Sequence, residues 1–398
     1  MARILFLVDF EEGHVLSTMS LSKTLVARGH HILYAGLPDA ENTIVGQGFS
    51  FRPIMQDLFP KGATRGPRRN LAFTKGVGFA RCVSGELLDD LIREFRPDAA
   101  VALSYYYLEA LAIHFRYGVP IVFFTPDLRT VNRAEAASSV IDGLMNNTFG
   151  VPEFVDLLLK AGVSIRSLAD VAALLLKMPE LIALPRSFEP PEVSQDALVY
   201  YIGCGVDLRR QEPSRPWRTL AGGRPLIYCS LGSQCGLRAD ISTRFFNIAL
   251  QTLAARPEWY LVLSVGKTID LGSLSPRPSN VHAANWVPQM ELLSVASLMI
   301  THCGIGTVKE CILSRVPMAA FPLMRDQFDC AERVARLGLG LSGSIEEVTP
   351  DLLDGMITAA LDDGDIRRNI DAMSEAFRNE DCISMGADVV EDYARRAK

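Results

Sequence analysis

Two short segments of this chain carry residues whose types and spacing suit catalysis: His14, and the sequence His-Cys-Gly-Ile-Gly-Thr over residues 302–307. The ordinary pKa of a histidine lies near neutrality, so His14 could take a proton from an attacking hydroxyl group. A glycine turn at the start of a helix leaves backbone N–H groups uncovered for an anion. The two segments therefore predict a proton-transfer site and a phosphate site.

The residues around the second segment add groups that suit a nucleotide sugar. Trp286 follows an expected strand and can offer a ring face to a flat base. Glu310 lies one turn into the expected helix, close enough to accept hydrogen bonds from ribose hydroxyls. Asp326 and Gln327 begin the next helix and could hold sugar hydroxyls. A diphosphate would lie against the turn and helix start formed by His302, Gly304, Gly306 and Thr307.

The elements that must position these residues alternate between strand and helix. In the first half, strands are predicted at residues 4–8, 31–36, 99–103 and 119–124, with helices at 15–28, 79–95 and 108–116. In the second half, the alternation restarts at residue 225 and continues to a helix over 327–337. Such alternation predicts parallel sheets, whose ligands bind beyond the carboxyl ends of the strands. Both segments lie at such ends.

The length of 398 residues predicts two domains, since single cores stop growing at roughly 250 residues. Pro, Arg, Gly and Glu dominate residues 208–224, which we expect to form a linker between residues 1–207 and 225–384. The glycine-rich stretch 56–78, with its basic cluster of Arg65, Arg68 and Arg69, is expected to be a long loop. The predicted fold class is α/β, with two Rossmann-like domains facing across a cleft.

Composition excludes several classes of function. The net charge of −6 has the wrong sign for a protein that grips a phosphate backbone, so we expect no nucleic-acid partner. The eight cysteines include no C-x-x-C pair, which indicates free thiols in a reducing cytoplasm and no zinc site. Apolar runs fall short of the ~20 residues of a membrane span. We expect a cytoplasmic protein without a transmembrane segment.

The stretch from residue 285 to residue 327 resembles the donor-binding signature of family 1 glycosyltransferases. This family includes plant secondary-product glucosyltransferases and bacterial macrolide and natural-product glycosyltransferases. The matching residues are Trp286, Pro288, Gln289, His302, Cys303, Gly304, Thr307, Glu310, Pro317, Pro322, Asp326 and Gln327. Gly13-His14 and residues 28–32 resemble the acceptor-side motifs of the same family. Gly306 stands where the plant-type signature has Asn, which resembles the bacterial branch.

The resemblance implies a GT-B fold. Residues 1–207 would bind the acceptor, residues 225–384 would bind a nucleotide sugar, and a terminal helix at about 385–398 would pack back on the first domain. His14 would be the general base of an inverting transfer. No cofactor or metal is implied, because the nucleotide sugar is a co-substrate and the helix dipole, with its neighbouring side chains, can neutralise the leaving diphosphate.

The resemblance also implies a role for each residue on the donor side. Trp286 would stack on the base, and Val287 would bond the base through its backbone. The ribose would face Gln289 and Glu310. The diphosphate would be held by His302, Gly304, Gly306 and Thr307, helped by Ser233, and the sugar by Asp326 and Gln327.

One departure from the family concerns the support of His14. Many relatives carry an Asp that orients the catalytic His, at the end of the strand that follows a Pro-Asp pair. Here Pro97-Asp98 is followed by Ala-Ala-Val-Ala-Leu, and Ser104 is the nearest polar residue at that position. Either His14 works unaided, or an acid from elsewhere such as Asp127 supports it.

We expect a glycosyltransferase that moves a hexose from a uridine diphosphate sugar to a hydroxyl group of an apolar small-molecule natural product. The uridine preference rests on Glu310, because a deoxythymidine donor offers one ribose hydroxyl fewer. The apolar acceptor is suggested by residues 105–107 (Tyr-Tyr-Tyr), by Phe73 and Phe79, and by the apolar segment 149–184, unless these side chains pack the core. Alternatives are a sugar-nucleotide epimerase or lipid glycosyltransferase of the same fold, or a non-catalytic helper of a partner transferase.

Two sequence motifs are excluded as ligand sites by the elements that surround them. The G-x-G-x-x-G at residues 338–343 follows an expected helix and not a strand, so it does not predict a nicotinamide site. Asp363-Gly364-Asp365 is a D-x-D that lies in an acidic turn between expected helices, where a solvated surface is the simpler interpretation.

Overall fold

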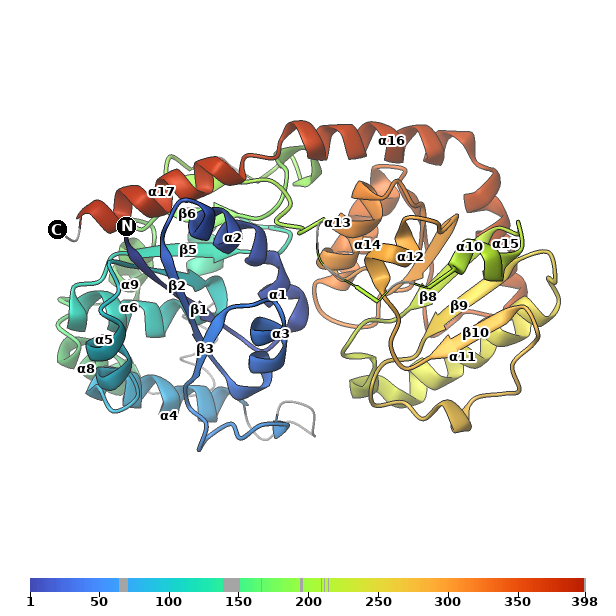
Figure 1. Cartoon of the computed structure of the whole chain (residues 1–398). Helices are drawn as coiled ribbons and strands as arrows, with labels where there is room; N and C mark the ends of the chain where they lie inside the picture. The colour runs from blue at the N-terminus through green and yellow to red at the C-terminus, as the bar shows by residue number, and fades with distance from the viewer. Residues whose placement is uncertain are drawn as a thin grey trace. The chain divides into compact units, whose positions relative to one another are not determined.

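The computed structural model describes residues 1–63, 71–138, 151–165, 167–193, 196–208, 210, 212–213 and 215–396. The chain forms two compact units, the first made of residues 1–205 with 381–398 and the second of residues 206–380. Each unit contains a parallel β-sheet with helices connecting its strands (Figure 1). The predicted α/β class with two Rossmann-like domains is thus confirmed. The expected boundaries at residues 207 and 385 lie close to the division between the units.

The sheet of the first unit has strands in the order β3-β2-β1-β4-β5-β6-β7. The strands are β1 (Arg3–Val8), β2 (His31–Gly36), β3 (Ser50–Pro53), β4 (Ala99–Leu103), β5 (Ile121–Thr125), β6 (Glu180–Ile182) and β7 (Val199–Tyr201). β1 pairs in parallel with β2 on one side and with β4 on the other. All five residues of β4 and of β5 are buried, which explains their continuous apolar sequence.

The first unit's helices differ from the sequence prediction at three places. They are α1 (Glu12–Ser17), α2 (Met19–Ala27), α3 (Glu41–Gly46), α4 (Leu71–Ser84), α5 (Asp89–Phe95), α6 (Tyr107–Tyr117), α8 (Val151–Lys160), α9 (Leu168–Leu175) and α17 (Ile383–Arg396). The single helix expected over 15–28 is two helices, α1 and α2. The loop expected over 56–78 is wrong from residue 71 onward, where α4 begins. The single helix expected over 79–95 is also wrong, because α4 ends at Ser84, Gly85 has a φ of +89°, and α5 begins at Asp89.

The glycine at position 78 serves close packing in α4 and does not break the helix. A Cβ at Gly78 would lie 2.7 Å from Met55 Sδ, so a larger residue there would require the Met55 side chain to shift. The next residue, Phe79, and Cys82 and Val83 one turn on are buried in the core of the unit. Helical spacing of these apolar residues outweighs the intrinsic cost of a glycine, about 1 kcal/mol.

The sheet of the second unit has strands in the order β10-β9-β8-β11-β12-β13. The strands are β8 (Leu226–Ser230), β9 (Tyr260–Ser264), β10 (Val281–Ala284), β11 (Leu298–Thr301), β12 (Met318–Ala320) and β13 (Gly340–Ser342). The helices are α10 (Trp217–Ala221), α11 (Ala239–Ala254), α12 (Gln289–Leu293), α13 (Ile305–Leu313), α14 (Gln327–Arg336), α15 (Pro350–Asp362) and α16 (Gly364–Asn379). β8 and β11, both fully buried, are adjacent at the centre of the sheet.

Part of the segment expected as a linker is folded. α10 lies within residues 208–224, and the Trp217 ring is 2% exposed. Trp217 Nε1 donates to Glu291 Oε2, which ties α10 to α12 within the second unit. Large aromatic burial stabilises such a short helix where its composition alone does not. The prediction that residues 208–224 form a linker is therefore wrong for the part that folds as α10.

The terminal helix α17 belongs to the first unit. It packs against α2, and Arg28 Nη1 is 2.6 Å from Asp388 Oδ1 across that contact. His30 Nε2 lies 3.0 Å from Glu391 Oε1. The helix also contributes Ala387 and Val390 to the core around β1. Among the described residues, no helix is both long and apolar enough to cross a membrane.

Some sequence expectations lie outside the described residues. The basic cluster of Arg65, Arg68 and Arg69 falls there, as do residues 149–150 of the expected apolar acceptor segment. The side chains of Phe73 and Tyr105 are likewise outside the description.

Candidate active site

His14 lies at the carboxyl end of the first strand of its unit, within α1. Its Nδ1 forms a 2.7 Å hydrogen bond with Asp9 Oδ2. Asp9 is the residue that follows β1, and its other carboxylate oxygen accepts a 2.9 Å hydrogen bond from Glu11 N. Asp9 is only 8% exposed. The acid is therefore held from two sides, and it fixes one edge of the imidazole ring. Sequence reasoning missed this contact.

The other ring nitrogen of His14 faces two further carboxylates. Nε2 is 3.5 Å from Asp127 Oδ1 and 3.7 Å from Glu11 Oε2. Asp127 follows β5, which stands two strands from β1 in the sheet. Burial alone would lower the pKa of His14, but the charges and hydrogen bonds of Asp9 and Asp127 more than offset it and hold the pKa well above 6.5. The acids therefore favour the protonated form of the His14 ring.

Ser104 does not take part in this cluster. It begins the short 3₁₀ turn Ser104–Tyr106 after β4, and within the described part of the chain it forms no hydrogen bond with His14. Of the two supports suggested by the sequence, the structure brings Asp127 to the ring and leaves Ser104 apart from it.

The aromatic residues after β4 pack largely into the core of the first unit. Tyr106 is 6% exposed and belongs to the hydrophobic core, as does Phe79 at 1%. Tyr107 packs edge-on against Phe123 with ring centroids 4.7 Å apart. Their expected place in an acceptor wall is therefore wrong for Tyr106 and Phe79. Apolar side chains after a strand end can pack into the core of their own unit or line a binding site. The sequence alone does not distinguish these two possibilities.

In the second unit, His302 follows β11 and lies beside two glycines. A Cβ at Gly232 would be 2.3 Å from His302 Nε2, and a Cβ at Gly304 would be 2.6 Å from it. Gly232 also has a φ of +78°, which favours glycine. Both turns thus bring bare backbone against one edge of the imidazole, where a larger side chain would displace the ring.

The protonation of His302 is opposite to that of His14. The ring is half-buried, and its Nδ1 has no exposed surface. Burial lowers the pKa of His302 to about 4, against a smaller opposing effect of the Ser230 backbone. The ring is therefore neutral at neutral pH. A neutral imidazole can donate a hydrogen bond to an anion but cannot supply a full positive charge.

α13 begins one residue after Gly304 and brings several predicted donor residues together. Gln289 Nε2 lies 2.5 Å from Glu310 Oε2 and 3.4 Å from Thr307 Oγ1. Tyr228 donates a 3.0 Å hydrogen bond to Gln289 Oε1, which fixes the orientation of the amide. Gly306 and Thr307 lie in the first turn of α13. Gln289, Thr307 and Glu310 therefore form one polar cluster at the start of the helix.

Arg210 completes this cluster, and no local pattern in the sequence pointed to it. Its Nη1 lies 3.0 Å from Glu310 Oε1, and its Nη2 lies 2.7 Å from Glu212 Oε1. Glu212 Oε2 in turn accepts hydrogen bonds from Met290 N and Glu291 N at 2.9 and 3.3 Å. The arginine and Glu212 thus link the segment before α10 to α12 and to Glu310. The pairing spans 100 residues of sequence.

The remaining predicted donor residues differ in how exposed their side chains are. Trp286 follows β10 and is 48% exposed, so a ring face is open for stacking, while the Val287 side chain is buried. Gln327 is 8% exposed, and its Oε1 accepts from Leu323 N and Met324 N. That leaves the Gln327 amide nitrogen as the group able to meet a ligand. Ser233 lies in the turn after β8, and Asp326 directly precedes α14.

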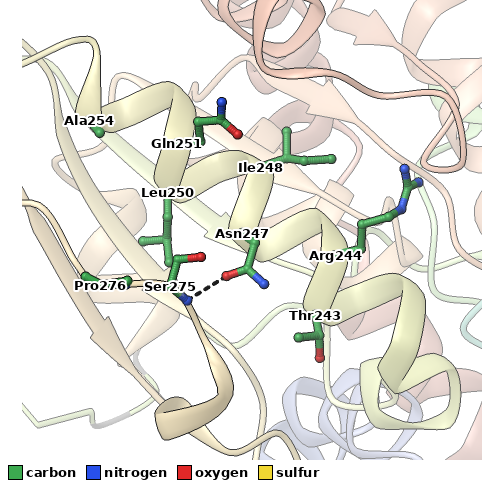
Figure 2. A pocket seen from close by; sticks show the side chains of 9 residues that line it. All are labelled: Thr243, Arg244, Asn247, Ile248, Leu250, Gln251, Ala254, Ser275 and Pro276. Carbon is green, nitrogen blue, oxygen red and sulfur yellow. Dashed lines mark hydrogen bonds between the residues drawn. The ribbon is translucent and has the colours of Figure 1, made fainter.

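Two other features of the second unit do not join this site. A hollow of about 690 Å³ runs along α11 and residues Ser275 and Pro276 (Figure 2). Its lining contains none of the predicted site residues, and Asn247 in it accepts from Ser275 N at 2.7 Å. In the D-x-D, Asp363 caps α16 by accepting from Asp365 N and Ile366 N. That carboxylate therefore has a structural role.

Comparison with known proteins identifies similar chains over both units. Residues 260–391 match the family described as erythromycin biosynthesis protein CIII-like, C-terminal domain. The oleandomycin glycosyltransferase of Streptomyces antibioticus is 26% identical, over 95% of this chain and 88% of its own length. The demethyllactenocin mycarosyltransferase of Streptomyces fradiae is 27% identical, over 98% of this chain and 86% of its own length.

Solved structures show the same architecture. The glycotransferase of kitacinnamycin superposes with a TM-score of 0.80 at 26% identity, covering 99% of this chain and 100% of that one. The calicheamicin glycosyltransferase CalG4 has a TM-score of 0.77 at 22% identity and covers 99% of both chains, a likeness of fold. Both likenesses extend over the whole length of the chain.

Proposed function

We infer that this chain is a family 1 glycosyltransferase of the bacterial natural-product type with a GT-B fold. From that premise we propose that it moves a hexose from a uridine diphosphate sugar to a hydroxyl group of a hydrophobic small molecule, with inversion at the anomeric carbon. The observation that carries the proposal is His14, which stands after β1 with carboxylates at both of its ring nitrogens. A transfer to a hydroxyl needs such a base.

In the proposed reaction the acceptor proton passes to His14 Nε2. The acceptor oxygen attacks the anomeric carbon from the face opposite the diphosphate, and the bond between that carbon and the diphosphate oxygen breaks. His14 ends as an imidazolium, which nearby Asp127 and Asp9 stabilise. Only the neutral ring can accept the proton, so activity rises with pH through the raised pKa of His14.

On the donor side the leaving diphosphate gains negative charge, and the start of α13 supplies uncovered N–H groups to receive it. The neutral His302 ring and the Thr307 hydroxyl add hydrogen bonds at the same place. Trp286, with its open ring face, stacks on the base, and Val287 bonds it through the backbone. The other assigned contacts are Ser233, Gly304 and Gly306 for the diphosphate, Gln289 and Glu310 for the ribose, and Asp326 and Gln327 for the sugar.

The choice of uridine rests on Glu310. Each of its carboxylate oxygens accepts one protein hydrogen bond, from Arg210 and from Gln289, and a carboxylate oxygen has two lone pairs. One lone pair on each oxygen is left for a ribose hydroxyl. The competing donor is a thymidine diphosphate sugar, since two of the similar structures, VinC and SpnG, were solved as complexes with thymidine diphosphate.

A hydrophobic aglycone as acceptor is supported by the relatives. Their names refer to oleandomycin and demethyllactenocin, and one similar structure was solved with spinosyn aglycone. The acidic surroundings of His14, with Asp9, Glu11 and Asp127 close to the ring, disfavour acceptors that carry a carboxylate near the reacting hydroxyl.

The test is a transfer screen with the whole protein. Uridine and thymidine diphosphate sugars are incubated with macrolide, polyketide, flavonoid and sterol aglycones, and products are identified by mass spectrometry. Proton NMR of the anomeric coupling reports inversion. Glycoside formation that is lost in His14→Ala supports the proposal. Conversion of the nucleotide sugar to an epimer without any glycoside, or no binding of any nucleotide, would overturn it.

A further inference from the structure

We propose that Asp9 is the positioning residue of the base: its carboxylate orients the His14 ring through Nδ1 and stabilises the imidazolium formed in the transfer. It takes the place of the acid that many relatives carry after the strand equivalent to β4, where this chain has Ser104. The inference rests on the proposed function, because it assigns a role beside the same histidine.

The geometry around Asp9 is that of a fixed acceptor. One oxygen contacts His14 Nδ1 at 2.7 Å, and the other accepts from Glu11 N at 2.9 Å. The residue follows β1, whose residues Ile4 to Val8 are all buried, and it is itself 8% exposed. The carboxylate therefore has little freedom to rotate away. A neutral His14 that donates through Nδ1 to this oxygen keeps the Nε2 lone pair for the acceptor proton.

The other charged groups around the ring cannot serve this purpose. Asp127, which follows β5, and Glu11, which precedes α1, both face Nε2, at 3.5 and 3.7 Å. Nε2 is the nitrogen that the acceptor hydroxyl must reach, so an acid on that side cannot hold the productive tautomer. Tyr106 lies near Asp9 from the turn after β4, and its pKa is raised, chiefly by burial, so it stays uncharged.

The arrangement also explains where the charge goes. Before transfer, Asp9 carries the only charge of the Asp9–His14 pair, and afterwards the pair is an anion beside a cation at 2.7 Å. Opposite charges this close in a partly buried site favour the protonated ring. The same attraction raises the pKa of His14, so the acid limb of the pH–rate profile lies above the ordinary value for a histidine.

The experiment compares Asp9→Asn with Asp98→Asn. Asn keeps the size of Asp9, but its amide nitrogen donates to Nδ1 and so favours the wrong tautomer. We expect kcat to fall on the order of 10²- to 10⁴-fold, as when a triad aspartate is replaced by Asn. The dissociation constant for uridine diphosphate, measured by calorimetry, should be unchanged. The acid limb of kcat/KM should move to lower pH. Asp98 accepts from Arg3 N at the opposite end of the sheet, so Asp98→Asn should keep the wild-type profile.

A measurement on the wild type does not depend on how the variant folds. In protein labelled with ¹⁵N-histidine, the His14 signals are assigned by their loss in His14→Ala, and the ring is observed above its pKa. The proposal expects the neutral ring to be protonated on Nδ1. A neutral ring protonated on Nε2, or Asp9→Asn with wild-type kcat and an unmoved acid limb, would overturn it. If glycosyl transfer is present and His14-dependent in that case, the proposed function stands while the role of Asp9 fails.

Discussion

His14 and His302 both lie beyond the carboxyl end of a central strand of a parallel sheet, and they have opposite electrostatics. Each follows the carboxyl end of a buried parallel strand, β1 in one unit and β11 in the other. Acids contact both ring nitrogens of His14, whereas glycine backbones flank His302. The pKa of His14 is accordingly raised, and burial brings that of His302 to about 4. Both histidines stand at a strand end, and their neighbours determine which of them exchanges a proton near neutral pH.

The largest expected effect comes from removing the exchanging histidine. His14→Ala should lower kcat on the order of 10²-fold or more, because a positioned general base contributes about that much. Nucleotide affinity should stay within about twofold, since the residues proposed to bind the donor lie in the other unit. Steady-state kinetics with calorimetry of uridine diphosphate binding separates the two quantities. A variant with wild-type turnover would remove His14 from the mechanism.

Next in size is the loss of the Glu310 carboxylate, which we propose to bind the ribose. Glu310→Gln should weaken the binding of uridine diphosphate by about 1.5–3 kcal/mol, the usual contribution of a charged hydrogen bond, and should weaken 2′-deoxyuridine diphosphate less, because only the 3′-hydroxyl is left to bond the carboxylate. Calorimetry with both nucleotides measures the difference. Wild-type affinities that are equal for the two nucleotides would contradict the assignment of Glu310 to both ribose hydroxyls.

A smaller effect should follow from crowding His302. In Gly232→Ala, a Cβ 2.3 Å from the imidazole displaces the ring, and the residue must also keep a φ of +78°. We expect a stability loss of about 1–3 kcal/mol, and a weakening of nucleotide binding of about tenfold. Gly223 is the matched control, because it has a φ of +82° and nothing within 4 Å. Gly223→Ala should lose stability through the backbone alone and keep nucleotide affinity. Equal nucleotide affinities in Gly232→Ala and Gly223→Ala would refute the prediction that displacing the His302 ring weakens nucleotide binding.

The smallest expected effect concerns Asp127, which contributes to the raised pKa of His14. Removing its charge in Asp127→Asn should move the acid limb of kcat/KM to lower pH, since a group that favours the protonated ring is lost. Turnover well above the limb should change less than in Asp9→Asn. A pH–rate profile from pH 5 to 9 measures both. An acid limb that moved to higher pH would contradict the charge pattern around the ring.

The sequence predicted the elements that depend on local pattern. Buried apolar runs located the central strands, and the glycine turn with His302 located the start of α13. These signals are local because a buried parallel strand must be apolar on both faces, and the close approach of backbone to His302 needs glycine. The position of His14 at a strand end follows from the same local pattern, since the apolar run of β1 ends just ahead of it.

The contacts that the sequence did not predict connect residues through space. Arg210 reaches Glu310 across 100 residues, and its surroundings looked like a linker by composition. Asp9 was visible only as the polar residue that interrupts an apolar run, although it lies five positions from His14. The contact forms because α1 begins at Glu12, directly after the extended residue Glu11, and brings His14 Nδ1 to the Asp9 carboxylate. Periodicity does not report such a contact.

The return of α17 to the first unit has a consequence for the order of folding. Arg28 and Asp388 meet although they are 360 residues apart in the chain. Ala387 and Val390 of α17 share a core with Ile4 and Phe6 of β1. During synthesis, the unit that emerges first must therefore wait for the last helix before its core is complete, while the second unit, residues 206–380, can close beforehand. Truncations within α17 should accordingly weaken the N-terminal unit and spare the one that directly precedes the helix.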